Sequence, residues 1–196
     1  MFLQTVGLEE ARGEIADIYQ NEIASMGLLM EATTCWTTRP EVLPHFERFS
    51  HGIKSGFSLG MRGWRLITLI AAQQVPSTYC VQVYSSVLAR EMGHEQVLAI
   101  VRDFRNAGLS DKDIAMLAYA QQVARDASKI TQADIDALRA VGFSDVEISD
   151  IALCASFRCF VSRFFDATGA TPEPAFFDPD PAFRAAMTVG KPLPDA

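Results

Sequence analysis

Residues 62–84 read RGWRLITLIAAQQVPSTYCVQVY, a stretch with one helical pattern on each side of a proline. Apolar residues recur three and four positions apart before and after Pro76, as on one face of an α-helix. Pro76 cannot continue the first helix, and Ser77 belongs to the residue types that begin helices well. The same spacing runs through almost the whole chain, whereas the alternation typical of strands is nearly absent. The sequence therefore predicts an all-α protein.

Several of the expected helices begin at a recognisable signal. A Ser or Thr followed three residues later by an acidic residue, the pattern of a capping box, occurs at Ser110, Thr131 and Ser144. The helix after Ser144 is expected to be the longest, over residues 145–168. Six of the nine prolines follow it, so we expect one helical domain over residues 1–170 and a Pro-rich C-terminal arm, not part of the core, over 171–196.

Composition excludes several classes of protein. The chain has 196 residues, of which 17 are Lys or Arg and 24 are Asp or Glu, so its formal net charge is −7. This acidic balance, without a basic cluster, argues against binding to nucleic acid. No apolar run approaches the roughly 20 residues of a membrane-spanning helix, and the N-terminus lacks the pattern of a signal peptide. We therefore expect a cytoplasmic protein that binds neither nucleic acid nor membranes.

The residues that usually hold metals or cofactors form no pattern. Four cysteines are too few for a disulfide framework in a chain of this length, and no pair has the spacing of zinc ligands. The three histidines complete no metal site, and no phosphate-binding or dinucleotide-binding motif is present. The sequence therefore predicts no metal and no cofactor.

Cys80 is the most informative candidate for chemistry. If Ser77 caps the second helix, Cys80 occupies the third helical position, where unpaired backbone N–H groups and the helix dipole favour a thiolate. The alternative is that Cys80 is a small buried hydrophobe on the inward face of this helix.

Residues 62–70 and 77–84 resemble the core of the AhpD-like and carboxymuconolactone decarboxylase superfamily, especially its peroxidase-related branch. Further segments that resemble this branch are residues 9–19, 106–110, 130–134, 140–145 and 160–163. The resemblance covers about residues 5–172. It implies an AhpD-like helical bundle, an alkylhydroperoxidase-like role in antioxidant defence, and a homo-oligomer in which the C-terminal tail lies across a partner subunit.

The resemblance also implies a catalytic signature, from which this chain departs. In AhpD-like enzymes a Glu and a His relay a proton, so that one Cys of a Cys-x-x-Cys motif attacks a hydroperoxide and the other closes a disulfide. Cys80 matches the second Cys. The family's Glu, first Cys and His are replaced by Arg65, Ser77 and Tyr84.

Each replacement has a chemical consequence. Ser77 can cap the helix but cannot form a disulfide. Tyr84 can donate a hydrogen bond but is a poor proton shuttle at neutral pH. Arg65 cannot act as a base. If it points into the pocket, it would stabilise the Cys80 thiolate and attract an anionic substrate.

Three hypotheses follow. In the first, the chain is a peroxidase-related oxidoreductase with weakened or altered activity. Cys80 is its only retained redox centre, and an external thiol, Cys35, Cys154 or Cys159 resolves the sulfenate. In the second, the chain is a non-redox, decarboxylase-like enzyme or pseudoenzyme that binds an anionic small molecule at Arg65, with Ser77 and Tyr84 adding hydrogen bonds. In the third, the chain only binds a protein partner, and no pocket lies beside Cys80.

A further hypothesis concerns a carboxylate at the start of the chain. Glu31 stands where the peroxidase-related branch tends to have another residue type, and it could form an ion pair with Arg65.

Overall fold

The computed structural model describes residues 1–193, and this part of the chain contains helices and no strand. The prediction of an all-α single domain is confirmed. The α-helices are α1 (Glu14–Met26), α2 (Glu31–Thr34), α3 (Val42–Ser55), α4 (Gly60–Gln74), α5 (Thr78–Met92), α6 (His94–Asp103), α7 (Asp111–Asp126), α8 (Gln132–Ala140), α9 (Asp145–Thr168) and α10 (Pro181–Ala186). Single 3-10 turns are η1 (Cys35–Thr38), η2 (Phe104–Asn106), η3 (Ala127–Lys129) and η4 (Pro174–Phe176).

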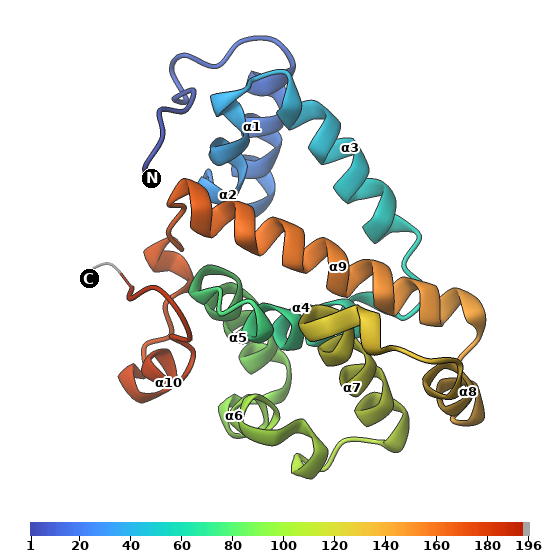
Figure 1. Ribbon diagram of the computed structural model, residues 1–196. Helices are drawn as coiled ribbons and strands as arrows, with labels where there is room; N and C mark the ends of the chain where they lie inside the picture. The colour runs from blue at the N-terminus through green and yellow to red at the C-terminus, as the bar shows by residue number, and fades with distance from the viewer. Residues whose placement is uncertain (194–196) are drawn as a thin grey trace.

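Helix α4 is the centre of the core. It packs against α5, α7 and α9, and every residue from 66 to 72 is buried. A helix that is apolar on all sides is stable only when neighbours cover it all round, which explains this position. In Figure 1, α9 crosses the molecule, with α1 and α3 above it and α6, α7 and α8 below. Helices α4 and α5 therefore present their side chains to α9.

The junction of α4 and α5 forms much as the sequence predicts. Helix α4 ends at Gln74, before Pro76, and α5 begins directly after Ser77. The Ser77 carbonyl accepts the first helical hydrogen bond, from the Val81 N–H at 3.0 Å. The Ser77 side chain, however, makes no capping hydrogen bond. Ser77 thus starts the helix through its backbone and not through its hydroxyl.

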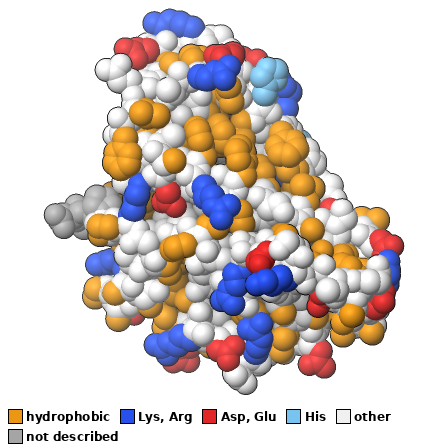
Figure 2. All heavy atoms as spheres, viewed as in Figure 1, with side chains coloured by type: hydrophobic (Ala, Val, Ile, Leu, Met, Phe, Trp, Pro, Cys, Tyr) orange, Lys and Arg blue, Asp and Glu red, His pale blue; other side chains and the backbone are white. Residues whose placement is uncertain are grey.

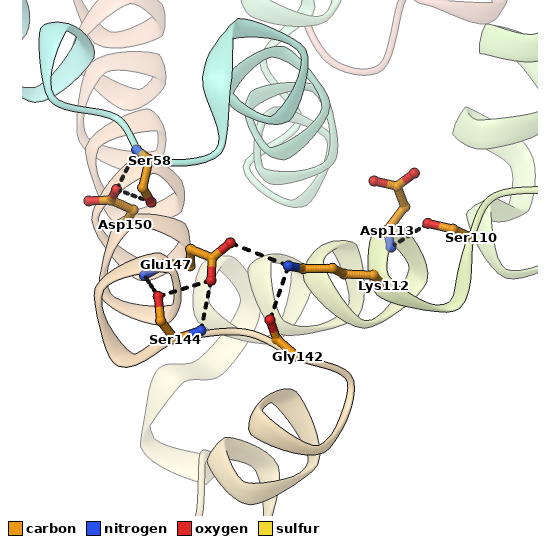
Figure 3. Close-up of polar contacts among 8 residues, drawn as sticks. All are labelled: Ser58, Ser110, Lys112, Asp113, Gly142, Ser144, Glu147 and Asp150. Atoms are coloured by element: carbon orange, nitrogen blue, oxygen red, sulfur yellow. Dashed lines mark hydrogen bonds and ion pairs between the residues drawn. The ribbon is translucent and has the colours of Figure 1, made fainter.

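The three predicted capping signals are confirmed. Ser110, Thr131 and Ser144 directly precede α7, α8 and α9. Figure 3 shows that Lys112 of α7 joins this network, because its Nζ donates to the Gly142 carbonyl at 3.1 Å and to Glu147 at 3.3 Å. The start of α9 is therefore fixed against α7, which sets the register of the side chains that α9 directs into the core.

The segment after α9 differs from the arm that its prolines suggest. Phe183 and Met187 are 1% and 0% exposed, and α10 packs against α6. Gln82 of α5 donates to the Arg184 carbonyl at 2.8 Å, and His94 lies 2.6 Å from the Asp178 carboxylate. The expectation of an arm outside the core is wrong for this segment, because prolines report an irregular backbone and do not report whether apolar side chains between them are buried.

The loop after α10 closes over the start of α5. The Gly190 N–H donates to Thr78 Oγ1 at 2.9 Å, and a Cβ at position 190 would lie 1.9 Å from the Pro76 carbonyl oxygen. Only glycine fits such a close approach of two backbones.

One face of the molecule is partly apolar. Figure 2 shows apolar side chains gathered on the upper half of this face, in the area that α3 and α9 occupy in Figure 1. Large exposed apolar side chains on these two helices are Phe49, Val146, Leu153 and Phe160. Among the described residues, no helix combines the length and the apolar character needed to cross a membrane.

Candidate active site

Cys80 lies in the first turn of α5 and is only 1% exposed. Its Sγ accepts two hydrogen bonds from α9, one from Arg158 Nη1 at 3.2 Å and one from Ser162 Oγ at 3.1 Å. Arg158 and Ser162 are four residues apart, so they lie on the same face of the helix. The sulfur thus has two hydrogen-bond donors, one of which carries a permanent positive charge.

Arg158 is a buried cation, 4% exposed, without a carboxylate partner among residues 1–193. Its Nη2 donates to Tyr84 Oη at 3.0 Å, the guanidinium carbon lies 4.8 Å from the centre of the Tyr84 ring, and Nε has no partner. Burial lowers the pKa of Arg158, but the neighbouring Tyr84 and Cys80 side chains raise it by more, so its pKa is above the ordinary value.

A buried charge is costly unless an opposite charge compensates it. Cys80 and Tyr84 are the side chains that contact the Arg158 guanidinium. The Arg158 guanidinium therefore lies between the Cys80 sulfur and the Tyr84 hydroxyl, and no carboxylate among residues 1–193 pairs with it.

A cavity of about 210 Å³ borders this pair. Cys80, Tyr84 and Arg158 line it together with aromatic side chains from α3, α5 and α9, namely Phe46, Tyr79, Phe157 and Phe165. Phe46 stacks on Trp36 with ring centres 3.9 Å apart, and Phe157 lies 6.1 Å from Trp64. The hypothesis of a module without a pocket beside Cys80 is therefore wrong.

The aromatic pocket also holds three charged side chains besides Arg158. Glu22 of α1 lines it, as do Glu47 and Lys54 of α3. Among the described residues, no group of three or more His, Cys, Asp or Glu side chains could hold a metal ion.

Arg65 is not one of the residues that line this pocket. It forms an ion pair with Glu91, and its side chain is 28% exposed. Arg65 lies near the start of α4 and Glu91 lies near the end of α5, so these two helices pack antiparallel. Glu91 lies eleven residues after Cys80 in the sequence, or about 16 Å along the helix axis. The expectation that Arg65 stabilises the thiolate is therefore not supported, and Arg158 occupies that position instead.

Ser77 is fully buried, and its Oγ has no hydrogen-bond partner in the described part of the chain. It does not line the pocket, whereas Tyr84 does. The hypothesis of a Glu31–Arg65 ion pair is wrong, because the Glu31 carboxylate accepts from the Thr171 N–H at 2.8 Å and Arg65 pairs with Glu91.

The other cysteines are free, and the hydrogen-bond partners of Cys80 are Arg158 and Ser162 rather than a second cysteine. Cys154 lies 3.8 Å from Thr68 Oγ1, and Cys159 lies 4.0 Å from the Ala124 carbonyl. Burial raises the pKa of Cys35 and of Cys154 to about 12, and it also raises the pKa of Cys159. These thiols are therefore poor nucleophiles in the folded protein.

Sequence reasoning missed Arg158, Ser162 and Glu47. One signal was available for Arg158, which interrupts the apolar stretch from Ile151 to Phe165 on the predicted longest helix. A charge inside such a stretch is unusual for a buried helix face and marks a position with a specific partner. The sequence offered no means of identifying that partner as Cys80.

Comparison with known proteins identifies the fold. The chain is similar to an AhpD-core, peroxidase-related protein from Ralstonia eutropha, with TM-score 0.81 and 21% identity over 90% of this chain and 94% of that chain. It is also similar to an uncharacterized peroxidase-related protein from Silicibacter sp., with TM-score 0.77 and 22% identity over 88% and 93% of the two chains.

A third similar structure is the debrominase Bmp8, solved as a cysteine-to-alanine variant in complex with 2,3,4-tribromopyrrole. Here the TM-score is 0.77 and the identity 16%, over 95% of this chain and 97% of that chain. No family model matches the sequence, and no curated protein matches it. The predicted AhpD-like fold is confirmed by these structures.

Proposed function

We propose that the protein is a one-cysteine peroxidase in which the Cys80 thiolate reduces a hydroperoxide. The observation that carries this proposal is the pair of hydrogen bonds to Cys80 Sγ, from Arg158 Nη1 at 3.2 Å and from Ser162 Oγ at 3.1 Å, at the edge of a pocket. A thiolate is the reactive form of cysteine, and a cation beside it makes that form available at neutral pH.

The first step transfers one oxygen atom. The thiolate attacks the terminal peroxide oxygen, a sulfur–oxygen bond forms, and the oxygen–oxygen bond breaks. Cys80 becomes a sulfenic acid, and the leaving alkoxide takes up one proton to become an alcohol. This proton comes from water. Tyr84 is placed to donate a hydrogen bond to the leaving oxygen, because its Oη accepts from Arg158 and its own hydrogen stays free for the pocket.

Regeneration of Cys80 is assigned to an external reductant, since burial raises the pKa of Cys35, Cys154 and Cys159 and all three are poor nucleophiles. A small thiol condenses with the sulfenic acid, releasing water and leaving a mixed disulfide. A second thiol molecule then releases Cys80 and carries away the oxidised thiol as a disulfide. The turnover is weakened relative to a two-cysteine cycle, and its need for free thiols agrees with a cytoplasmic role in antioxidant defence.

The experiment that tests the function is trapping of the sulfenic acid. Wild type treated with an organic hydroperoxide and then with a 1,3-diketone probe is expected to carry the probe on Cys80, identified by peptide mass spectrometry. Cys80→Ser is expected to lose labelling and thiol-dependent hydroperoxide consumption by at least about 100-fold, because the attacking atom is gone.

Cys159→Ser is the matched control and is expected to behave as wild type, because Cys159 does not line the aromatic pocket. Absence of Cys80 sulfenate in wild type, in protein whose Cys80 still reacts with an alkylating agent, would contradict the proposed function.

The non-redox alternative is less well supported. It depends on Arg65 as the anchor for an anionic molecule, and Arg65 pairs with Glu91 away from the pocket. An anion would instead need Arg158, whose two terminal nitrogens already donate to Cys80 and Tyr84.

A second candidate is thiol-dependent removal of bromide from a halogenated aromatic compound. The aromatic lining of the pocket favours it, since planar rings stack well on such walls. In this reaction two thiols are oxidised to a disulfide, a carbon–bromine bond becomes a carbon–hydrogen bond, and bromide and one proton leave. Bromide release from 2,3,4-tribromopyrrole in the presence of a small thiol tests it.

A further inference from the structure

The charges around the Cys80 pocket come from three helices. Glu22 lies on α1, Glu47 and Lys54 lie on α3, and Arg158 lies on α9 beside the cysteine. All four side chains line the same cavity of about 210 Å³. A charged ligand entering this cavity therefore meets carboxylates as well as cations.

Glu22 stabilises the packing of α1 against α2. Its two carboxylate oxygens accept hydrogen bonds from Thr33 Oγ1 at 2.6 Å and from the Met30 N–H at 3.0 Å, which tie α1 to the start of α2. Burial raises the pKa of Glu22, and these two hydrogen bonds oppose that effect. Its carboxylate is thus held as an acceptor beside the pocket.

Glu47 does not hold two elements together in this way. It is half-buried and makes no hydrogen bond or ion pair with any residue in the described range 1–193. Burial raises the pKa of Glu47 above its ordinary value, and the nearby Lys54 side chain partly opposes this effect. Glu47 thus lines the cavity with a carboxyl group that has no partner among the described residues, and this group is available to interact with a ligand.

The balance of charge is unfavourable for anions. Arg158 already donates to Cys80 and Tyr84, and Lys54 is exposed, with its Nζ 5.9 Å from the centre of the Trp64 ring. Two carboxylates then face one solvated cation. In a partly buried pocket, like charges repel more strongly than they do in water.

We propose that the pocket takes uncharged hydroperoxides with an aromatic or branched apolar body, and that Glu47 is the residue that rejects substrates bearing a carboxylate. The aromatic walls supply the surface for the apolar body. The substrate class rests on the proposed peroxidase function, whereas rejection of anions by Glu47 is independent of it.

Two alkylating agents test the charge selection directly. Iodoacetamide is neutral and iodoacetate is anionic, and both attack a thiolate at the same type of carbon. The ratio of their rate constants at Cys80, followed by peptide mass spectrometry, is expected to exceed the ratio for a neutral cysteine derivative in solution by about fivefold. Glu47→Gln is expected to lower this ratio to near the value for the cysteine derivative, mainly because Cys80 reacts faster with iodoacetate.

Glu41→Gln is the matched control, because Glu41 is exposed just before α3 and does not line the pocket. Its ratio is expected to equal that of wild type. The proposal is overturned if the ratio of the iodoacetamide rate constant to the iodoacetate rate constant in wild type is no higher than that of the free thiol. This measurement uses wild type alone and so does not depend on the folding of a variant. A Glu47→Gln ratio equal to that of wild type overturns the role of Glu47.

The substrate class is tested with cumene hydroperoxide and its para-carboxylate derivative, a pair that differs in one charge. Wild type is expected to form Cys80 sulfenate about fivefold faster with the neutral compound, and Glu47→Gln is expected to narrow the difference. If neither compound gives sulfenate while the alkylation ratio still shows selection, the peroxidase function and the substrate class are overturned and charge selection by Glu47 is supported.

Discussion

At the scale of single residues, the site is a contact between the start of one helix and the middle of another. Cys80 and Tyr84 could be selected from the sequence because they belong to one local pattern on α5. Arg158, which contacts both of them, lies 78 positions from Cys80, so no local spacing connects them. Its role as the partner of the cysteine required the packing of α5 against α9.

The charge of Arg158 predicts how reactive Cys80 is. Arg158→Met keeps the bulk of the side chain and removes the cation that donates to the Cys80 sulfur. The rate constant for alkylation of Cys80 by iodoacetamide at pH 7 is expected to fall by about tenfold, equivalent to about 1.4 kcal/mol. The measurement is peptide mass spectrometry of Cys80 after timed exposure to iodoacetamide.

Arg163→Met serves as the control, because Arg163 is exposed on the same helix and lines a different surface hollow. Its rate constant is expected to match that of wild type. Thermal unfolding of Arg158→Met is expected to occur at a lower temperature than that of wild type, because the buried Cys80 sulfur and Tyr84 hydroxyl lose their donor. An unchanged alkylation rate in Arg158→Met would falsify the role of the cation beside Cys80.

At the scale of elements, the beginnings of helices were the most predictable feature. A capping box consists of hydrogen bonds between residues three apart, so the sequence contains all of its parts. Arg65 shows the limit of such local reasoning. Its place in the motif is visible in the sequence, but its direction depends on how α4 lies against α5, where Glu91 is its partner.

The cap of α9 is expected to contribute to stability. Ser144→Ala removes the hydroxyl that accepts from the Glu147 N–H at 3.3 Å and that donates to the Glu147 carboxylate at 2.9 Å. The free energy of unfolding is expected to fall by about 1 kcal/mol, as measured by urea denaturation. Ser149→Ala, in the interior of the same helix, is the comparison, and an equal loss in both variants would show that the cap itself contributes nothing.

At the scale of the whole molecule, the apolar face over α3 and α9 fits the homo-oligomer that the resemblance implies. Phe160 is 52% exposed and Leu153 is 40% exposed, about two turns apart on one side of α9. The tail is less suited to reach a partner than expected, since Phe183 and Met187 are buried in their own chain. We therefore expect subunits to meet through helices.

Sedimentation velocity at micromolar concentration is expected to give an oligomer for wild type and a smaller species for the double variant Leu153→Glu, Phe160→Glu, because charges in an apolar interface are costly. Glu95→Gln, on α6 and outside this face, is expected to sediment as wild type. A monomeric wild type would contradict the expectation.

The stacking of Phe46 on Trp36, at 3.9 Å, and the approach of Phe157 to Trp64, at 6.1 Å, place both tryptophans of the chain one side chain behind the pocket wall. Indole emission depends on the packing and polarity of its immediate surroundings. The protein therefore carries two optical reporters of its own, and occupation of the pocket can be followed by fluorescence without attaching a dye.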